Sequence, residues 1–211
     1  MSKHRKNSRR KKYINRTLIK FAKVLFLLFE IIGFPKYFSK FSNKIFNNWQ
    51  LFALLIIRAK TKQSPEDLVE QFLPGNEGLL NALALAKIPT ASALRKFARG
   101  LKARWGHTAL AGCAALAGLN DVCSGIDGTG HSKLKGSKHY YRRSKKETVW
   151  SVVKQKMGDA VTSLKFHMQK IELLCRYLAY NIDRILTLQK KSKIMQLFSD
   201  ELKIILMEDL K

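Results

Sequence analysis

The sequence predicts a mainly α-helical protein with one small β-hairpin. Apolar residues recur at helical spacing along most of the chain, whereas alternation with a period of two is confined to about residues 120–142. The chain has 211 residues, 46% of them hydrophobic, so it is able to bury a substantial core. We therefore expect one or two small domains built mostly from helices.

The N-terminal part is predicted to be a basic arm followed by helices. Residues 1–15 are rich in lysine and arginine without apolar periodicity, so we expect a disordered arm that is also suited to bind phosphates. Residues 16–60 are apolar and helical in character, and Gly33 and Pro35 predict a break. The apolar run over 23–34 is shorter than the roughly 20 residues that cross a membrane, so no stable membrane span is expected.

The next helix is marked by its end signals. Ser64 suits the N-cap, Pro65 suits the first helical position, and Glu66 and Asp67 are favoured at the positive end of a helix. Pro74 then stops the helix.

A basic helix is predicted to begin at Thr90 or Ser92. Its apolar face consists of Leu94, Phe97, Ala98, Leu101 and Trp105. Arg95, Lys96 and Arg99 lie outside this face and are candidate phosphate-binding residues. Residues 16–106 are thus predicted to be a helical, DNA-binding region of helix-turn-helix type, although a charged solvent face explains the same pattern.

The predicted hairpin begins with the stretch "NDVCSGID". Its alternating residues indicate a short strand, and Asp127-Gly128 is a hairpin turn signal. From Lys145 the pattern is helical almost to the end. One apolar stripe contains Ile171, Leu174, Leu178, Ile182 and Ile185. Residues 191–211 predict a C-terminal amphipathic helix.

The charge of the chain points to a polyanionic partner. Lysine and arginine number 40 against 15 acidic residues, which gives a formal net charge of +25. Such a charge is typical of proteins that bind DNA, RNA or an anionic membrane surface, and double-stranded DNA is the partner that we expect. An oligomer is compatible with the sequence. The three cysteines have no C-x-x-C spacing, which is typical of buried, reduced thiols in the cytoplasm.

Two carboxylates in a basic stretch are candidate site residues. Asp127 follows the predicted strand among glycines, and Glu147 opens the next helix. Seven residues bring a helix to within about 20° of two full turns, so Glu147 and Lys154 share a face. If this helix begins early, Tyr140 and Arg143 join them. The simpler roles, a turn residue and a first-turn acid, explain each carboxylate separately.

Together these side chains suit metal-assisted phosphodiester chemistry. Carboxylate oxygens from Asp127 and Glu147 are the ligands that Mg²⁺ or Mn²⁺ prefers. The guanidinium of Arg143 and the ammonium of Lys154 are suited to hold DNA phosphates.

The sequence resembles DDE transposases of bacterial and archaeal insertion sequences over roughly residues 45–190. "GIDGTGHSKLKGSKHYYRR" is similar to their first-aspartate block, and the spacing Tyr-x2-Arg-x3-Glu-x6-Lys is similar to their closing block. The resemblance implies an RNase H-like α/β catalytic domain, here over 120–190. It also implies metal-dependent DNA cleavage and strand transfer, with Asp127 and Glu147 as catalytic metal ligands.

The chain departs from that family in the middle of the catalytic domain. Asp127 and Glu147 are only 20 residues apart (147 − 127), which leaves no room for the strands that carry the second aspartate. Asp159 and Asp183 come after the glutamate, in the wrong order. We therefore expect an internally shortened, catalytically impaired, nucleoid-associated transposase that still binds DNA.

Two alternatives belong to other classes of protein. A non-enzymatic, basic, helical nucleic-acid-binding protein explains the charge as well as a transposase does. It does not explain the two sequence blocks that resemble DDE transposases. A peripheral membrane protein that uses residues 21–34 explains neither carboxylate.

Overall fold

The structure, a computed structural model, describes residues 3–41, 44–116 and 149–188 and is mainly helical. The described residues contain no strand, and the hairpin predicted for about 120–142 lies outside them. The helices are α1 (Lys3–Ile31), α2 (Asn48–Thr61), α3 (Pro65–Asp67), α4 (Glu77–Ala82), α5 (Ala91–Gly100), α6 (Ala103–Leu116) and α8 (Phe166–Leu188). A π-helical turn, Leu68–Phe72, continues α3, and residues 149–157 are also helical.

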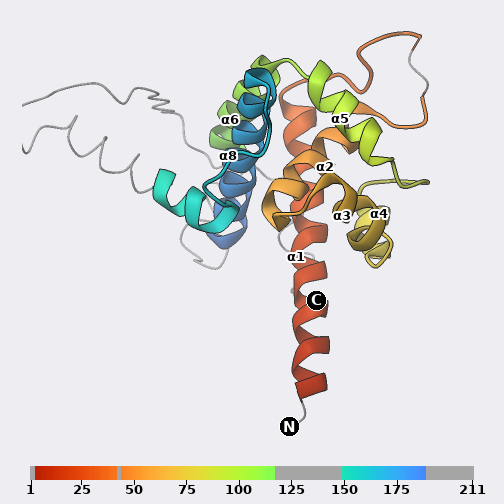
Figure 1. The fold of residues 1–211 in the computed structure, drawn as a ribbon, viewed down its shortest axis with the longest axis vertical. Helices are drawn as coiled ribbons and strands as arrows, with labels where there is room; N and C mark the ends of the chain where they lie inside the picture. Colours follow the sequence, from red (N-terminus) through yellow and green to blue (C-terminus); the bar gives the residue numbers. More distant parts are fainter. Residues whose placement is uncertain (1–2, 42–43, 117–148, 189–211) are drawn as a thin grey trace, which may run out of the picture.

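One hydrophobic core joins these helices. Helix α8 packs against α6 and α2, and α1 contacts α2, α4, α6 and α8 (Figure 1). The core therefore takes side chains from both predicted parts, 16–106 and 120–190. No helix in the described ranges combines the length and the apolar character that crossing a membrane requires.

Helix α1 is longer than the sequence suggested. It begins at Lys3, so it includes most of the segment expected to be a disordered arm, and its N-terminal half extends past the other helices (Figure 1). Lysine and arginine are good helix formers, and each residue added to an existing helix gains a hydrogen bond. Packing of the C-terminal half, where Phe21 and Leu25 are fully buried, supplies that existing helix.

The predicted break at Gly33 is confirmed, and its geometry explains why glycine stands there. Gly33 has a φ of 62°, which favours glycine. The N–H of Phe34 donates to the carbonyl of Phe29, and the N–H of Gly33 donates to that of Glu30. This is a Schellman motif, and the rings of Phe34 and Phe29 make its hydrophobic contact with centroids 5.5 Å apart.

The predicted cap at Ser64 is also confirmed, and Thr90 is the cap of α5. The side chain of Ser64 accepts a hydrogen bond from the N–H of Asp67, and that of Thr90 accepts one from the N–H of Ala93. The basic helix, however, does not continue to Trp105. It ends at Gly100, because the extended backbone of Leu101 turns that side chain into the core and a new helix starts at Ala103.

The apolar stripe of α8 is confirmed. All five predicted residues, Ile171, Leu174, Leu178, Ile182 and Ile185, are buried. Helix α6 approaches this stripe closely at Gly106, where an added Cβ would lie 2.7 Å from Cδ1 of Leu174. The helical pattern from Lys145 onward is interrupted, because Gly158 has a φ of 90° and α8 starts only at Phe166.

Candidate nucleic-acid interface

A buried ion pair on α8 fixes the segment that precedes this helix. The guanidinium of Arg176 contacts the carboxylate of Glu172 at 2.7 Å, and each side chain is 8% exposed. Arg176 also donates hydrogen bonds to the carbonyls of Gly158 and Ala160, both at 2.6 Å. The interruption before α8 is therefore held in one conformation by a side chain of the helix itself.

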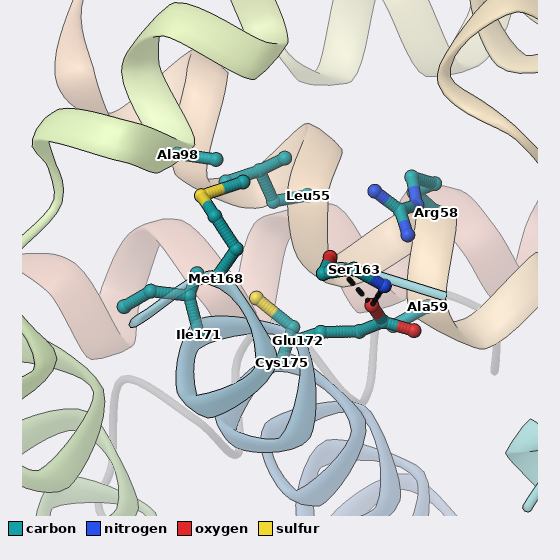
Figure 2. A pocket seen from close by; sticks show the side chains of 9 residues that line it. All are labelled: Leu55, Arg58, Ala59, Ala98, Ser163, Met168, Ile171, Glu172 and Cys175. Carbon is teal, nitrogen blue, oxygen red and sulfur yellow. Dashed lines mark hydrogen bonds between the residues drawn. The ribbon is translucent and has the colours of Figure 1, made fainter. Parts of the chain in front are cut away.

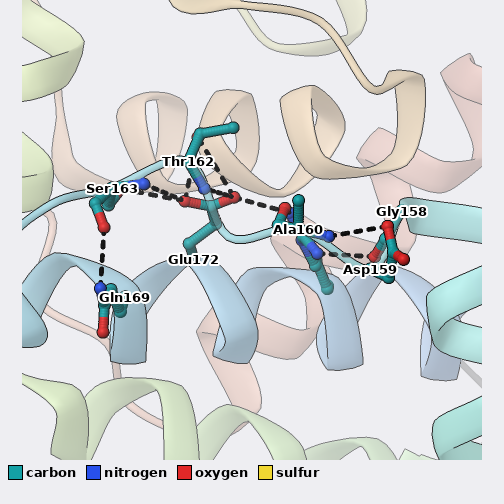
Figure 3. Close-up of polar contacts among 8 residues, drawn as sticks. Gly158, Asp159, Ala160, Thr162, Ser163, Gln169 and Glu172 are labelled. Atoms are coloured by element: carbon teal, nitrogen blue, oxygen red, sulfur yellow. Dashed lines mark hydrogen bonds and ion pairs between the residues drawn. The ribbon is translucent and has the colours of Figure 1, made fainter.

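Glu172 holds the other half of the same segment. Its carboxylate accepts hydrogen bonds from the backbone N–H and the hydroxyl of both Thr162 and Ser163, the shortest at 2.9 Å from Ser163 Oγ (Figure 3). Burial by itself raises the pKa of Glu172, but these hydrogen bonds and the charges of Arg176 and Arg58 outweigh it and lower that pKa. Glu172 is thus an anion with a structural role, and it keeps Thr162 and Ser163 at the surface above α8.

The fixed segment forms one wall of a basic groove. The groove has a volume of about 420 Å³ and lies between α2, the start of α3, α5 and the segment before α8. Its lining residues are Arg58, Pro65, Arg95, Arg99, Thr162, Ser163, Leu164, Lys165 and Met168. Four of these side chains are cations and none is an acid, so the groove is suited to an anionic ligand.

Each cation reaches the groove for a local reason. Arg95 and Arg99 are four residues apart on α5, one turn along the polar side that points away from the buried Leu94. Arg58 lies in the last turn of α2, where a positive charge is favoured by the helix dipole. Lys165 directly precedes α8 and is exposed.

The groove keeps a net positive charge after its ion pairs are considered. Arg95 pairs with Glu66 of α3, and both side chains are partly exposed. Among the described residues, no carboxylate forms an ion pair with Arg58, Arg99 or Lys165. Arg58 interacts electrostatically with Glu172, so Arg99 and Lys165 are the cations that remain most available to the phosphates of a ligand.

A second, much smaller pocket shares Arg58, Ser163 and Met168 with the groove. It is lined by apolar side chains of α2, α5 and α8, including Leu55 and Ile171, together with Arg58, Ser163 and Glu172 (Figure 2). Its volume of about 20 Å³ is close to the minimum for one water molecule. A substrate of ordinary size needs several hundred Å³, so this pocket is part of the packing between helices.

The predicted site residues are distributed between three places. Arg95 and Arg99 line the groove, whereas Lys96 is exposed on α5 outside it. The exposed Lys154 is likewise outside the groove, and its ammonium lies 5.1 Å from the centroid of the Trp150 ring. The remaining predicted residues, Asp127, Tyr140, Arg143 and Glu147, lie outside the described residues.

Asp159 and Asp183, which follow Glu147 in the sequence, have structural contacts. Asp183 of α8 pairs with Lys60 of α2, whose ammonium also lies 4.8 Å from the ring centroid of Phe21. Asp159 accepts a hydrogen bond from the N–H of Ala160 at 2.9 Å. Within the described ranges, no three histidine, cysteine, aspartate or glutamate side chains gather where they could hold a metal ion.

Sequence reasoning missed half of the groove. Arg58 sits in an apolar helix. Thr162, Ser163 and Lys165 had no local signal, because they lie within the stretch from Lys145 onward that was expected to be helical. The basic residue in the last turn of α2 was the one usable hint.

No protein family, curated protein or solved structure matches this chain.

Proposed function

We propose that this chain binds the phosphate backbone of double-stranded DNA through its basic groove. The observation that carries the proposal is the convergence of Arg58, Arg95, Arg99 and Lys165 on one groove without a lining acid. Guanidinium groups are suited to hold phosphate oxygens through paired hydrogen bonds. The formal net charge of +25 supports a polyanionic ligand of large extent.

We propose further that the chain is an internally shortened DDE transposase whose catalysis is impaired. The support is the resemblance of its two sequence blocks to those of DDE transposases. The separation of Asp127 and Glu147 by only 20 residues in the sequence supports the shortening. Two-metal catalysis needs ions about 3.5–4 Å apart, each held by well-placed carboxylates. Asp127 and Glu147 would hold one Mg²⁺ or Mn²⁺ poorly, and Asp183 is paired with Lys60.

Salt-dependent binding tests the DNA-binding part of the proposal. We expect the affinity for a duplex to fall steeply with salt, because each neutralised phosphate adds about 0.9 to the slope of log affinity against log salt. Arg99→Gln combined with Lys165→Gln should lower this slope by about 2. Arg104→Gln is the matched control, since Arg104 is an exposed helical arginine outside the groove. Equal affinity and slope for the groove variant and the wild type would refute the groove as the site.

Nicking of DNA tests the catalytic part. The substrate is a duplex with the terminal sequence of the DNA element that encodes this chain, incubated with Mg²⁺ or Mn²⁺. We expect no metal-dependent nicking by the wild type beyond that of Asp127→Ala and Glu147→Ala. Nicking by the wild type that both variants lose would show a competent active site.

A further inference from the structure

The connection between α1 and α2 exposes three aromatic rings next to two lysines. We call residues 36–41 the aromatic loop. Tyr37, Phe38 and Phe41 are 37%, 49% and 97% exposed, and Lys36 and Lys40 are exposed beside them. Figure 1 shows this connection, in orange, standing away from the helices beside α5. Exposed aromatic rings are costly in water, so such a cluster marks a contact surface.

The aromatic loop contacts α5 through the ring of Phe38. The ring of Phe38 lies almost parallel to that of Phe97, at 9° with centroids 6.2 Å apart, and meets Phe34 edge-on. Phe97 is about 160° around α5 from Arg95 and Arg99, given 100° per residue. The basic groove and the aromatic loop therefore lie on opposite sides of one helix.

Phe41 is the most prominent ring of the loop. At 97% exposed it has almost no contact with the rest of the protein, and Lys40 precedes it. A ring beside a cation fits a ligand that presents flat, apolar faces next to negative charges. Unpaired nucleotides have both features, because every base has a stacking face and every backbone unit carries a phosphate.

The geometry points to the aromatic loop as a stacking site for unpaired bases next to a duplex held in the groove. This inference rests on the proposed binding of DNA. The aromatic loop favours bases over a lipid surface, since the ring of Phe38 contacts Phe97 and a polar pair, Ser39 and Lys40, separates it from Phe41. The opposite placement of loop and groove on α5 suits a junction between paired and unpaired DNA.

Binding of two DNA probes tests the inference. The probes are a blunt duplex and the same duplex with an unpaired thymine overhang, compared by fluorescence anisotropy at one salt concentration. We expect the wild type to bind the overhang probe about tenfold more tightly, which is a typical effect of stacking one base on an aromatic ring. The full-length protein is used throughout.

Substitutions at Phe41 separate stacking from simple apolar contact. Phe41→Leu keeps an apolar side chain but removes the ring, whereas Phe41→Trp keeps an aromatic ring. Both variants should fold normally because the ring is almost fully exposed. We expect Phe41→Leu to lose most of the preference for the overhang and Phe41→Trp to keep it, with equal binding to the blunt duplex. Phe166→Leu, at an exposed ring on α8, is the matched control and should keep the preference.

Three results would overturn the inference. One is a wild type that binds both DNA probes equally, which leaves the proposed duplex binding intact. Another is a Phe41→Leu variant that keeps the full preference. The last is a protein without overhang preference that binds phosphatidylserine vesicles, with vesicle binding retained in Phe41→Leu. This pattern indicates that the loop contacts a lipid surface through its apolar side chains. Failure to bind either DNA probe would refute the proposed function and this inference together.

Discussion

Replacing Glu172 by glutamine should destabilise the protein far more than the same change at Glu66. Each glutamate pairs with an arginine, but the Glu172 and Arg176 side chains are both 8% exposed, whereas Glu66 and Arg95 are 41% and 47% exposed. Removing one partner of a buried pair leaves an uncompensated charge and costs about 3–5 kcal/mol of unfolding free energy. An exposed pair contributes about 0–1 kcal/mol.

Urea denaturation followed by far-ultraviolet circular dichroism measures this difference. Glu172→Gln should strongly lower the urea concentration at the unfolding midpoint, whereas Glu66→Gln should leave it nearly unchanged. The effect of Asp183→Asn should lie between these two. The pair of Asp183 with Lys60 is 23% and 17% exposed, which places it between the other two. Similar midpoints for Glu172→Gln and Glu66→Gln, with unchanged dependence on urea, would refute the role assigned to the buried pair.

The pH dependence of the same variant gives a second check. The folded protein lowers the pKa of Glu172 from its ordinary value of 4.5, so the unfolded chain takes up the proton first as the pH falls. The stabilisation from Glu172 is therefore complete above pH 4.5 and is lost as the pH falls through the lowered pKa. The stability difference between the wild type and Glu172→Gln should shrink in acid. A constant difference would contradict the lowered pKa.

Two further predictions concern packing inside the helical core. Gly106→Ala should destabilise the protein by about 1–3 kcal/mol, because the added Cβ would lie 2.7 Å from the side chain of Leu174. Gly100→Ala has open space around its Cβ and should not destabilise the protein. Thermal unfolding compares the two variants. Cys113 and Cys175 are buried, which raises the pKa of each thiol to about 12, so a Cys123→Ser variant should react with a disulfide reagent at pH 8 only after unfolding. Fast labelling of that variant in its native state would show that α6 and α8 open readily.

Local sequence signals determined the single elements of the fold. The stripe of α8, the cap at Ser64 and the chain reversal at Gly33 depend on a few neighbouring residues, and all three are confirmed. The prediction that the basic helix continues to Trp105 was wrong. Burial of Leu101 in the core outweighed the helical pattern, so α5 ends at Gly100. Helix propensity is weak compared with burial of a large side chain.

The candidate site divides in the same way. The sequence by itself determined the net charge and the exposure of Arg95 and Arg99 on one side of a helix, since periodicity reports which face is buried. Only the tertiary structure placed Arg58 and Lys165 opposite them, because α2, α5 and the segment before α8 meet through packing of residues far apart in the chain. That placement further depends on Glu172 and Arg176, which fix the segment by a buried pair that has no periodic signal.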